Sequence, residues 1–173
     1  RRQRQMCIRD RYNTAIGYEA GKNQSTADSN TFVGYQSGRQ TTGDNNTAVG
    51  YLAMADGQAA DNNTAVGKEA LKVFTGSHAT AIGALAADAA TTAGGVVAVG
   101  TNALTALVDG NNNTAVGISA AGSVTSSDDQ TAIGTNALAS CSTGAQNTAV
   151  GINAMKSITG CLLYTSDAAD EED

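Results

Sequence analysis

The chain has 173 residues, 41% of them hydrophobic, and a formal net charge of −6, which together indicate one acidic unit with a modest core. Aromatic residues make up only 4% of the chain, proline is absent and there are 20 glycines. These values exclude a thick globular core, because too few large side chains are present to fill it. Any core must be thin and built from Ala, Val, Ile and Leu.

Residues 1–11 form a basic arm, which is typical of nucleic-acid binding. However, a DNA string that encodes Arg1–Asp10 resembles a transposase-type sequencing-library adapter. The reverse complement of the same string, read in another frame, encodes Cys161–Asp170 near the other end. We therefore expect residues 1–11 and 161–173 to be disordered adapter-derived segments, and the chain to be a piece of a longer protein.

Removing both segments changes what the composition implies. Residues 12–160 keep five basic and ten acidic residues, a net charge of −5, which disfavours binding to a nucleic-acid backbone. Of the three cysteines only Cys141 remains, so no disulfide or metal-ligand spacing is left. We expect residues 12–160 to be a single repeat domain with no cofactor, no metal, no nucleic-acid partner and no membrane contact.

Residues 12–160 contain nine copies of a 16- or 17-residue repeat built around Asn-Thr-Ala-Val-Gly, each with one reference glycine. The reference glycines are Gly17, Gly34, Gly50, Gly67, Gly83, Gly100, Gly117, Gly134 and Gly151. The preceding residue is Ile or Val in every copy, and the residue before that is Ala in all copies except Phe32. The residue three places after the glycine is Ala in all copies except Ser37. This repetition predicts an all-β fold, a parallel β-solenoid or β-roll of about nine coils.

The residues before each reference glycine, such as Thr64–Val66, predict a short strand because β-branched side chains favour strands. Side chains alternate across a strand, so Thr and the Val or Ile share one face while Ala lies on the other. We expect the β-branched row to form the thin core and the Ala row to lie where another surface approaches closely. The glycine permits a turn, after which Asn102–Leu104 and its equivalents in other copies predict a shorter second strand. Polar turn residues predict a connection for the rest of each copy.

So thin a core leaves a single chain marginally stable, with one face exposed to solvent. Self-association would bury that face. A homotrimer with its chains side by side about the fibre axis buries one face per chain symmetrically, and we expect this arrangement.

The segments Asn63–Gly67 and Asn147–Gly151, with the Ala that follows three residues later, carry a family resemblance. They resemble the head repeats of trimeric autotransporter adhesins and are similar to repeats of phage tail-fibre-like proteins, over residues 13–155. The resemblance implies a left-handed parallel β-roll that forms a homotrimer, outside the cell, on an outer-membrane-anchored surface protein or a virion tail fibre. The Thr in place of the first apolar residue and the longer repeat depart from the adhesin pattern and favour the tail-fibre relatives.

Residues capable of catalysis or metal binding are few and isolated. His78 and Cys141 lie in polar connections without a partner base or a ligand cluster, which favours a turn role for both. The Asp109–Asn113 and Asp44–Asn46 turns lack the spacing of a dedicated calcium loop. Strand positions carry almost no Asp or Glu, which disfavours a sugar-processing β-helix, and the repeat length contradicts a hexapeptide-repeat acyltransferase. The Asn of each repeat is expected to stack into a ladder.

These observations predict a non-enzymatic fibrous segment that mediates attachment to a glycan or protein receptor on a host. Candidate receptor-contact residues are Tyr18, Tyr35 and Tyr51, each directly after a reference glycine. The alternatives are an ice-binding solenoid, which would present a flat and exposed Thr row as a monomer, and a purely structural solenoid.

Overall fold

The computed structural model describes residues 12–24, 27–58, 60–141 and 144–157. The segments expected to be adapter-derived, residues 1–11 and 161–173, lie outside these described residues. Within the described residues, the regular secondary structure consists of nine three-residue strands. They are β1 (Thr14–Ile16), β2 (Thr31–Val33), β3 (Thr47–Val49), β4 (Thr64–Val66), β5 (Thr80–Ile82), β6 (Val97–Val99), β7 (Thr114–Val116), β8 (Thr131–Ile133) and β9 (Thr148–Val150).

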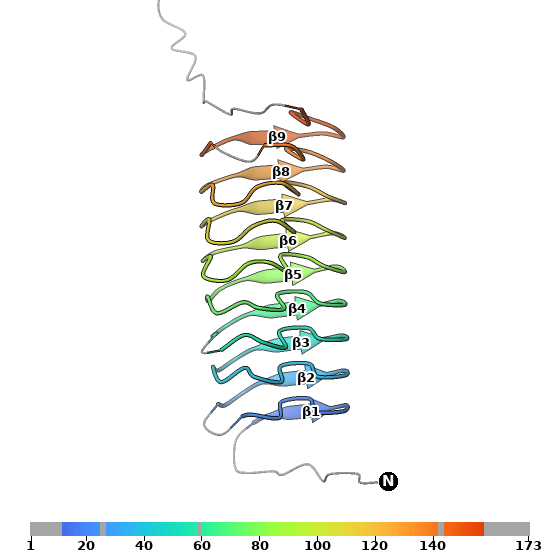
Figure 1. Cartoon of the computed structure of the whole chain (residues 1–173), viewed down its shortest axis with the longest axis vertical. Helices are drawn as coiled ribbons and strands as arrows, with labels where there is room; N and C mark the ends of the chain where they lie inside the picture. Colours follow the sequence, from blue (N-terminus) through green and yellow to red (C-terminus); the bar gives the residue numbers. More distant parts are fainter. Residues whose placement is uncertain (1–11, 25–26, 59, 142–143, 158–173) are drawn as a thin grey trace, which may run out of the picture.

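The nine strands form one parallel sheet in sequence order, so the chain winds as a solenoid with one strand in each coil (Figure 1). The pairing has no offset, because each strand's first residue faces the first residue of the next: Thr47 pairs with Thr64, and Val49 with Val66. The difference between 16- and 17-residue repeats is therefore absorbed in the connections. The predicted all-β parallel solenoid is confirmed.

The strand faces are the reverse of those expected. In β3 to β8 the central Ala is fully buried, whereas the residue on each side of it is only partly buried or exposed. The prediction that the β-branched row forms the core is wrong, as is the placing of the Ala row on the outside. The coil is so narrow that, except in β2, its strand wall turns only a methyl group inward. The bulk of the core comes from the opposite wall, as in Leu71, Leu104 and Leu138, all fully buried.

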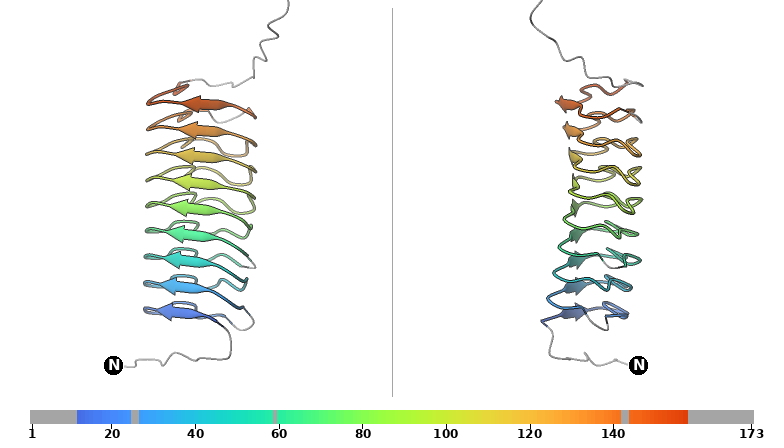
Figure 2. Two further views of the ribbon diagram at one scale, coloured as in Figure 1. Left: turned by 180° about the vertical axis from the view of Figure 1, so that it is seen from behind. Right: turned by 90° about the vertical axis from the view of Figure 1, so that its left-hand side faces the viewer.

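That opposite wall consists of turns and not of a second strand, so the prediction for Asn102–Leu104 is also wrong. Figure 2 shows the sheet along one side of the rod and the turns along the other. Asn102 and Leu104 both have positive φ, 58° and 53°. Asn102 N–H donates to the Ala84 carbonyl and Leu104 N–H to the Ala120 carbonyl, both at 3.0 Å. Hydrogen bonds to the coils on either side thus satisfy the backbone without a strand.

Buried Asn side chains link each coil to the next at the entrance to the strands. The Asn46 Oδ1 accepts a hydrogen bond from Asn63 N–H at 3.0 Å, and its Nδ2 donates to the Ala60 carbonyl at 2.6 Å. The ladder joins side chain to backbone and not amide to amide. It is interrupted in the fifth and sixth coils, where Ala79 and Val96 replace Asn, and in the eighth, where Gln130 replaces Asn and its Oε1 has no partner among the described residues.

One large residue occupies the strand wall. Phe32 takes the place of the inward Ala in β2 and is fully buried. The turn residue that faces it, Gly38, has no side chain, and a Cβ at this position would lie 2.6 Å from the Phe32 Cγ. In three later coils an inward Ala is combined with Leu at this turn position, as for Ala65 with Leu71, while two others have Ala there, Ala87 and Ala121. The two walls therefore exchange volume while the width of the coil is kept.

Candidate functional site: the sheet face and the tyrosine ladder

The outward side chains of β1 to β9 form a continuous surface, which we call the sheet face. It has one row of Thr, with Val97 in β6, and one row of Val or Ile. Several of the β-branched side chains are well exposed, including Ile82 at 42% and Ile133 at 41%. The Thr row is mostly half-buried between its neighbours. A long exposed row of apolar side chains is characteristic of a surface that contacts a partner.

The three candidate receptor residues lie together beside this face. Tyr18, Tyr35 and Tyr51 stack, with ring centroids 5.2 and 5.3 Å apart and interplanar angles of 14° and 12°. The rings are 63%, 44% and 48% exposed. Since adjacent rings cover part of each other's faces, this tyrosine ladder presents mainly ring edges and hydroxyl groups. The same row continues in later coils with exposed Ile118 and Ile152.

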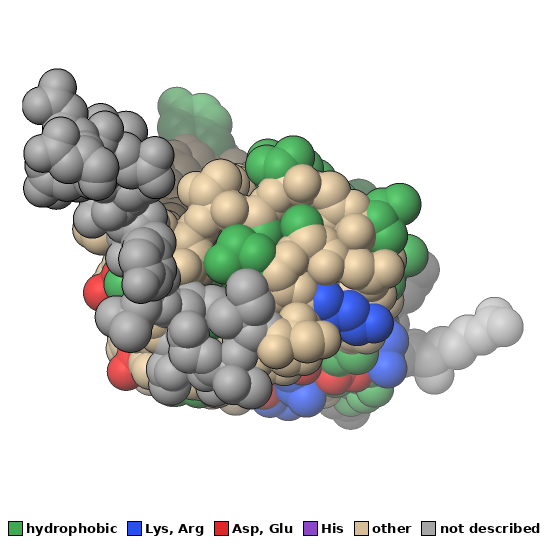
Figure 3. Space-filling model, turned by 90° about the horizontal axis from the view of Figure 1, so that it is seen from above, with side chains coloured by type: hydrophobic (Ala, Val, Ile, Leu, Met, Phe, Trp, Pro, Cys, Tyr) green, Lys and Arg blue, Asp and Glu red, His purple; other side chains and the backbone are tan. Residues whose placement is uncertain are grey.

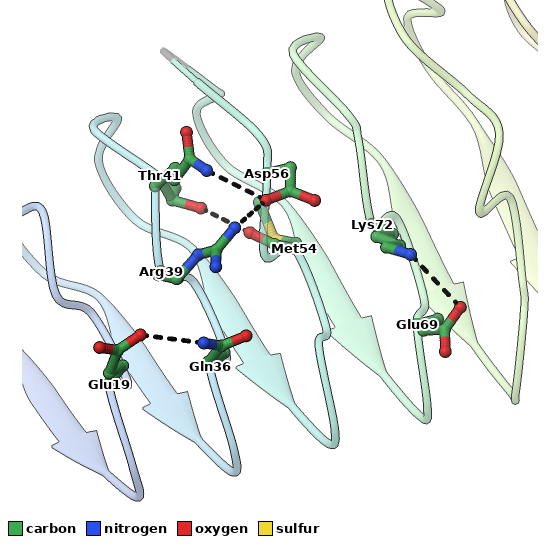
Figure 4. A network of polar contacts seen from close by, with 9 residues as sticks. Glu19, Gln36, Arg39, Thr41, Met54, Asp56, Glu69 and Lys72 are labelled. Carbon is green, nitrogen blue, oxygen red and sulfur yellow. Dashed lines mark hydrogen bonds and ion pairs between the residues drawn. The ribbon is translucent and has the colours of Figure 1, made fainter.

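A polar network runs beside the tyrosine ladder in the first coils (Figure 4). The Glu19 carboxylate accepts hydrogen bonds from Lys22 Nζ at 2.7 Å and from Gln36 Nε2 at 2.9 Å. These two bonds, the one from Lys22 first, lower the pKa of the Glu19 carboxyl below its ordinary value. Gln36 comes from the next coil, so the contact depends on the register of the solenoid.

The network continues in the following coils. The Asp56 Oδ1 accepts hydrogen bonds from Arg39 at 2.6 Å and from Gln40 at 3.1 Å, and Glu69 pairs with Lys72 at 3.6 Å. All ion pairs between described residues fall between Glu19 and Lys72. Seen along the rod, Lys and Arg side chains gather on one side of it (Figure 3). The four Lys and Arg residues between residues 12 and 72 thus all pair with carboxylates beside the aromatic row, while the later coils carry few charges.

The isolated residues considered from the sequence do not form a reactive site. His78 is exposed in the connection before β5, with φ of 63°. Cys141 is fully buried and disulfide-bonded, which the sequence did not predict because the chain's other two cysteines had been set aside. Those two cysteines lie outside the described residues.

The described part of the chain contains no group of three His, Cys, Asp or Glu side chains placed to hold a metal ion. In the Asp44–Asn46 turn, the Asp44 Oδ1 accepts a hydrogen bond from Asp28 N–H at 2.7 Å, and so supports the neighbouring coil. No helix in the same part is long and apolar enough to span a membrane.

Comparison of the chain with protein-family models, curated proteins and solved structures finds no significant match.

Proposed function

We propose that residues 12–160 are a non-enzymatic segment of a fibre, in a bacterial surface adhesin or a phage tail fibre, that attaches its parent particle to a host surface. The observation that carries the proposal is the continuous sheet face, whose Val and Ile row is exposed in β1, β5, β7, β8 and β9 and partly buried in β2, β3, β4 and β6. In the proposed extracellular homotrimer, three left-handed rods stand side by side. Each rod then buries its sheet face against the other two. The three contacts are equivalent, so the assembly closes with threefold symmetry.

The absence of acidic groups from the sheet supports a non-enzymatic role. Every outward strand position of β1 to β9 is Thr, Val or Ile, and none of these side chains can act as a general acid or base at neutral pH. The tyrosine ladder is the proposed receptor contact, because tyrosine combines a rigid apolar ring with a hydrogen-bonding hydroxyl and loses little conformational entropy on binding.

Ice binding is the second candidate, because the Thr row faces outward in register from coil to coil. The two proposals compete for one surface. A trimer built on the sheet face would cover the Thr row, whereas an ice-binding protein would keep it open as a monomer.

The mass of the full chain in solution separates these proposals. We expect light scattering to give three times the chain mass, and Ile82→Lys to give monomers because a charge buried in the interface has no partner. The matched control is Val108→Lys: Val108 is 43% exposed, close to Ile82 at 42%, but lies in a connection away from the strands. A monomeric wild type would contradict the trimer, and thermal hysteresis in that monomer would establish ice binding. Dissociation by Val108→Lys would contradict the assignment of the interface to the sheet face.

Attachment is tested with an array of immobilised host-surface glycans and matrix proteins. We expect the full chain to bind at least one of them and the triple variant Tyr18→Ser, Tyr35→Ser, Tyr51→Ser to lose that binding. The variant Ile118→Ser, Ile152→Ser removes exposed apolar groups from the same row outside the ladder, and should bind as the wild type does. Equal binding by both variants would show that the tyrosine ladder is not the contact.

A further inference from the structure

A hollow of about 750 Å³ opens on the connections that precede β5 to β8. It is lined by the residues six and five places before the reference glycine in four consecutive coils, with Gly94 and Gly95 among them. It lies in later coils than the tyrosine ladder. In the corresponding positions of most other coils, side chains with hydrogen-bonding groups fill this space.

Elsewhere in the solenoid two hydrogen bonds join these positions from coil to coil. The side chain six places before the glycine accepts a bond from the backbone N–H one coil earlier, as when the Asp61 Oδ1 accepts from Asp44 N–H at 2.8 Å. The next residue then donates its own N–H to the carbonyl of the earlier coil, as Asn62 N–H does to the Asp44 carbonyl at 3.0 Å. Together the two bonds close the edge of the rod.

Both bonds are missing at the hollow. Gly94 has no side chain to accept from Ser77 N–H, and Gly95 N–H does not reach the Ser77 carbonyl. Among the described residues, these two N–H groups and this carbonyl have no hydrogen-bond partner. The next coils show that losing the first bond alone does not remove the second. Ala145, one coil after Asp128, has no side chain that can accept a hydrogen bond, yet Gln146 N–H still donates to the Asp128 carbonyl at 3.1 Å. Ser77 and Gly94 are half-buried and Gly95 is exposed, so solvent reaches these groups, and a ligand that both donates and accepts could replace water there.

The rest of the lining decides the chemical class of that ligand. The carboxylates of Asp128 and Asp129 repel an anion, while the N–H groups of Ser77 and Gly95 and the amide of Asn112 are poor surroundings for a bare cation. A neutral polyol suits both kinds of group, because each hydroxyl can donate and accept a hydrogen bond. The volume is also within the range of small-molecule sites, about 300–1,000 Å³. We propose that this hollow binds a saccharide unit.

The site is separate from the tyrosine ladder and does not require the homotrimer, so it extends the proposed function without resting on it. The lining offers hydrogen bonds and the small imidazole ring of His78 but no Phe, Tyr or Trp ring, which predicts weak binding by each copy. Several copies in one fibre would raise the affinity for a surface that carries many such saccharides.

The test is a titration of the full ¹⁵N-labelled chain with galactose, glucose, mannose and N-acetylglucosamine, followed by the amide signals of Ser77, Gly94 and Gly95. We expect saturable shifts of these signals with at least one of the sugars, with a Kd in the millimolar range. Absence of saturable shifts with all four would overturn the proposal. So would saturation at these amides by calcium chloride or by inorganic phosphate in place of the sugars, since it would assign the hollow to an ion.

The decisive variant is Gly94→Asp, Gly95→Asn, which copies the Asp61–Asn62 pair and fills the hollow. A Cβ on Gly94 would lie 3.3 Å from the Asn111 Oδ1, and one on Gly95 would lie 2.8 Å from the Asn112 Oδ1, the end of a side chain that can rotate away. Gly95 has φ of 64°, a conformation that Asn62 and Asn112 adopt in this chain at 58° and 55°. We expect at least a tenfold loss of sugar binding with an unchanged or higher Tm. Unchanged binding by this variant would overturn the site. The triple tyrosine variant serves as the control and should keep the sugar titration of the wild type, even if it fails on the array.

Discussion

Gly117→Ala is expected to lower the free energy of unfolding by about 2–6 kcal/mol, through backbone strain and overpacking together. Gly117 has φ of 135°, a conformation that an L-residue resists. A Cβ at this position would also lie 2.6 Å from both the carbonyl carbon and the oxygen of Gly134 in the next coil. Since both neighbours are backbone, the solenoid has no flexible side chain that could move aside. Urea unfolding at a fixed protein concentration measures the effect.

Gly151→Ala is the matched control for this prediction. Gly151 has nearly the same φ, 129°, but the nearest described atom to its added Cβ is the Ala154 Cβ, at an ordinary contact distance of 3.8 Å. Only the backbone cost, about 1–3 kcal/mol, should remain. If both variants lose the same stability, close stacking of the reference glycines does not contribute, and the recurrence of Gly at this position reflects backbone conformation alone.

Phe32→Ala is expected to cost about 3–5 kcal/mol, because it leaves a cavity in a core that has few large side chains. Gly38→Leu alone should also destabilise the fold, since the new side chain would overlap the Phe32 ring. The combination of both substitutions copies the arrangement of Ala65 with Leu71, where Leu adopts φ of 49°. We expect the double variant to lose less stability than the sum of the single variants, by about 0.5–3 kcal/mol.

The same urea experiment, performed on the four proteins of this cycle, measures the coupling. A cycle in which the two losses simply add would contradict an exchange of volume between the strand wall and the turn wall. Gly21→Ala is a useful comparison, because its Cβ would approach Phe32 Cδ2 less closely, at 3.2 Å. It should therefore cost less than Gly38→Leu.

The period, the strand positions and the parallel stacking could be predicted because nine copies repeat the same residues at the same offsets. Which face of the strand points inward could not be predicted, because alternation shows that Thr64 and Val66 share a face but not which side of a coil it occupies. The sequence predicts that the Ala row of the strands lies where an outside surface approaches. The structure shows instead that these residues are small because they point into a narrow interior.

The second wall could not be predicted from residue preferences. Leu85 and Leu104 adopt positive φ, 58° and 53°, which β-strand and helix propensities both disfavour. Hydrogen bonds to the adjacent coils and, at Leu104, burial of the side chain stabilise the conformation in compensation. The tyrosines were identified from their shared place in the repeat, and their stacking follows from the register. The hollow could not be predicted from the repeat, because the residues that recur from copy to copy do not mark it. It arises where Gly94 and Gly95 lack the polar side chains found at the same positions in other copies.

The direction of the inter-coil hydrogen bonds has a mechanical consequence. The strands lie across the rod, so the hydrogen bonds that join each strand to the next, from β1 to β9, point along its axis (Figure 1). Tension applied along that axis would pull on one set of these bonds at a time and open the coils one after another. Each opened coil of 17 residues would release roughly 50 Å of chain. A rod of this kind would yield stepwise under load and so lengthen before its attachment to either end is broken.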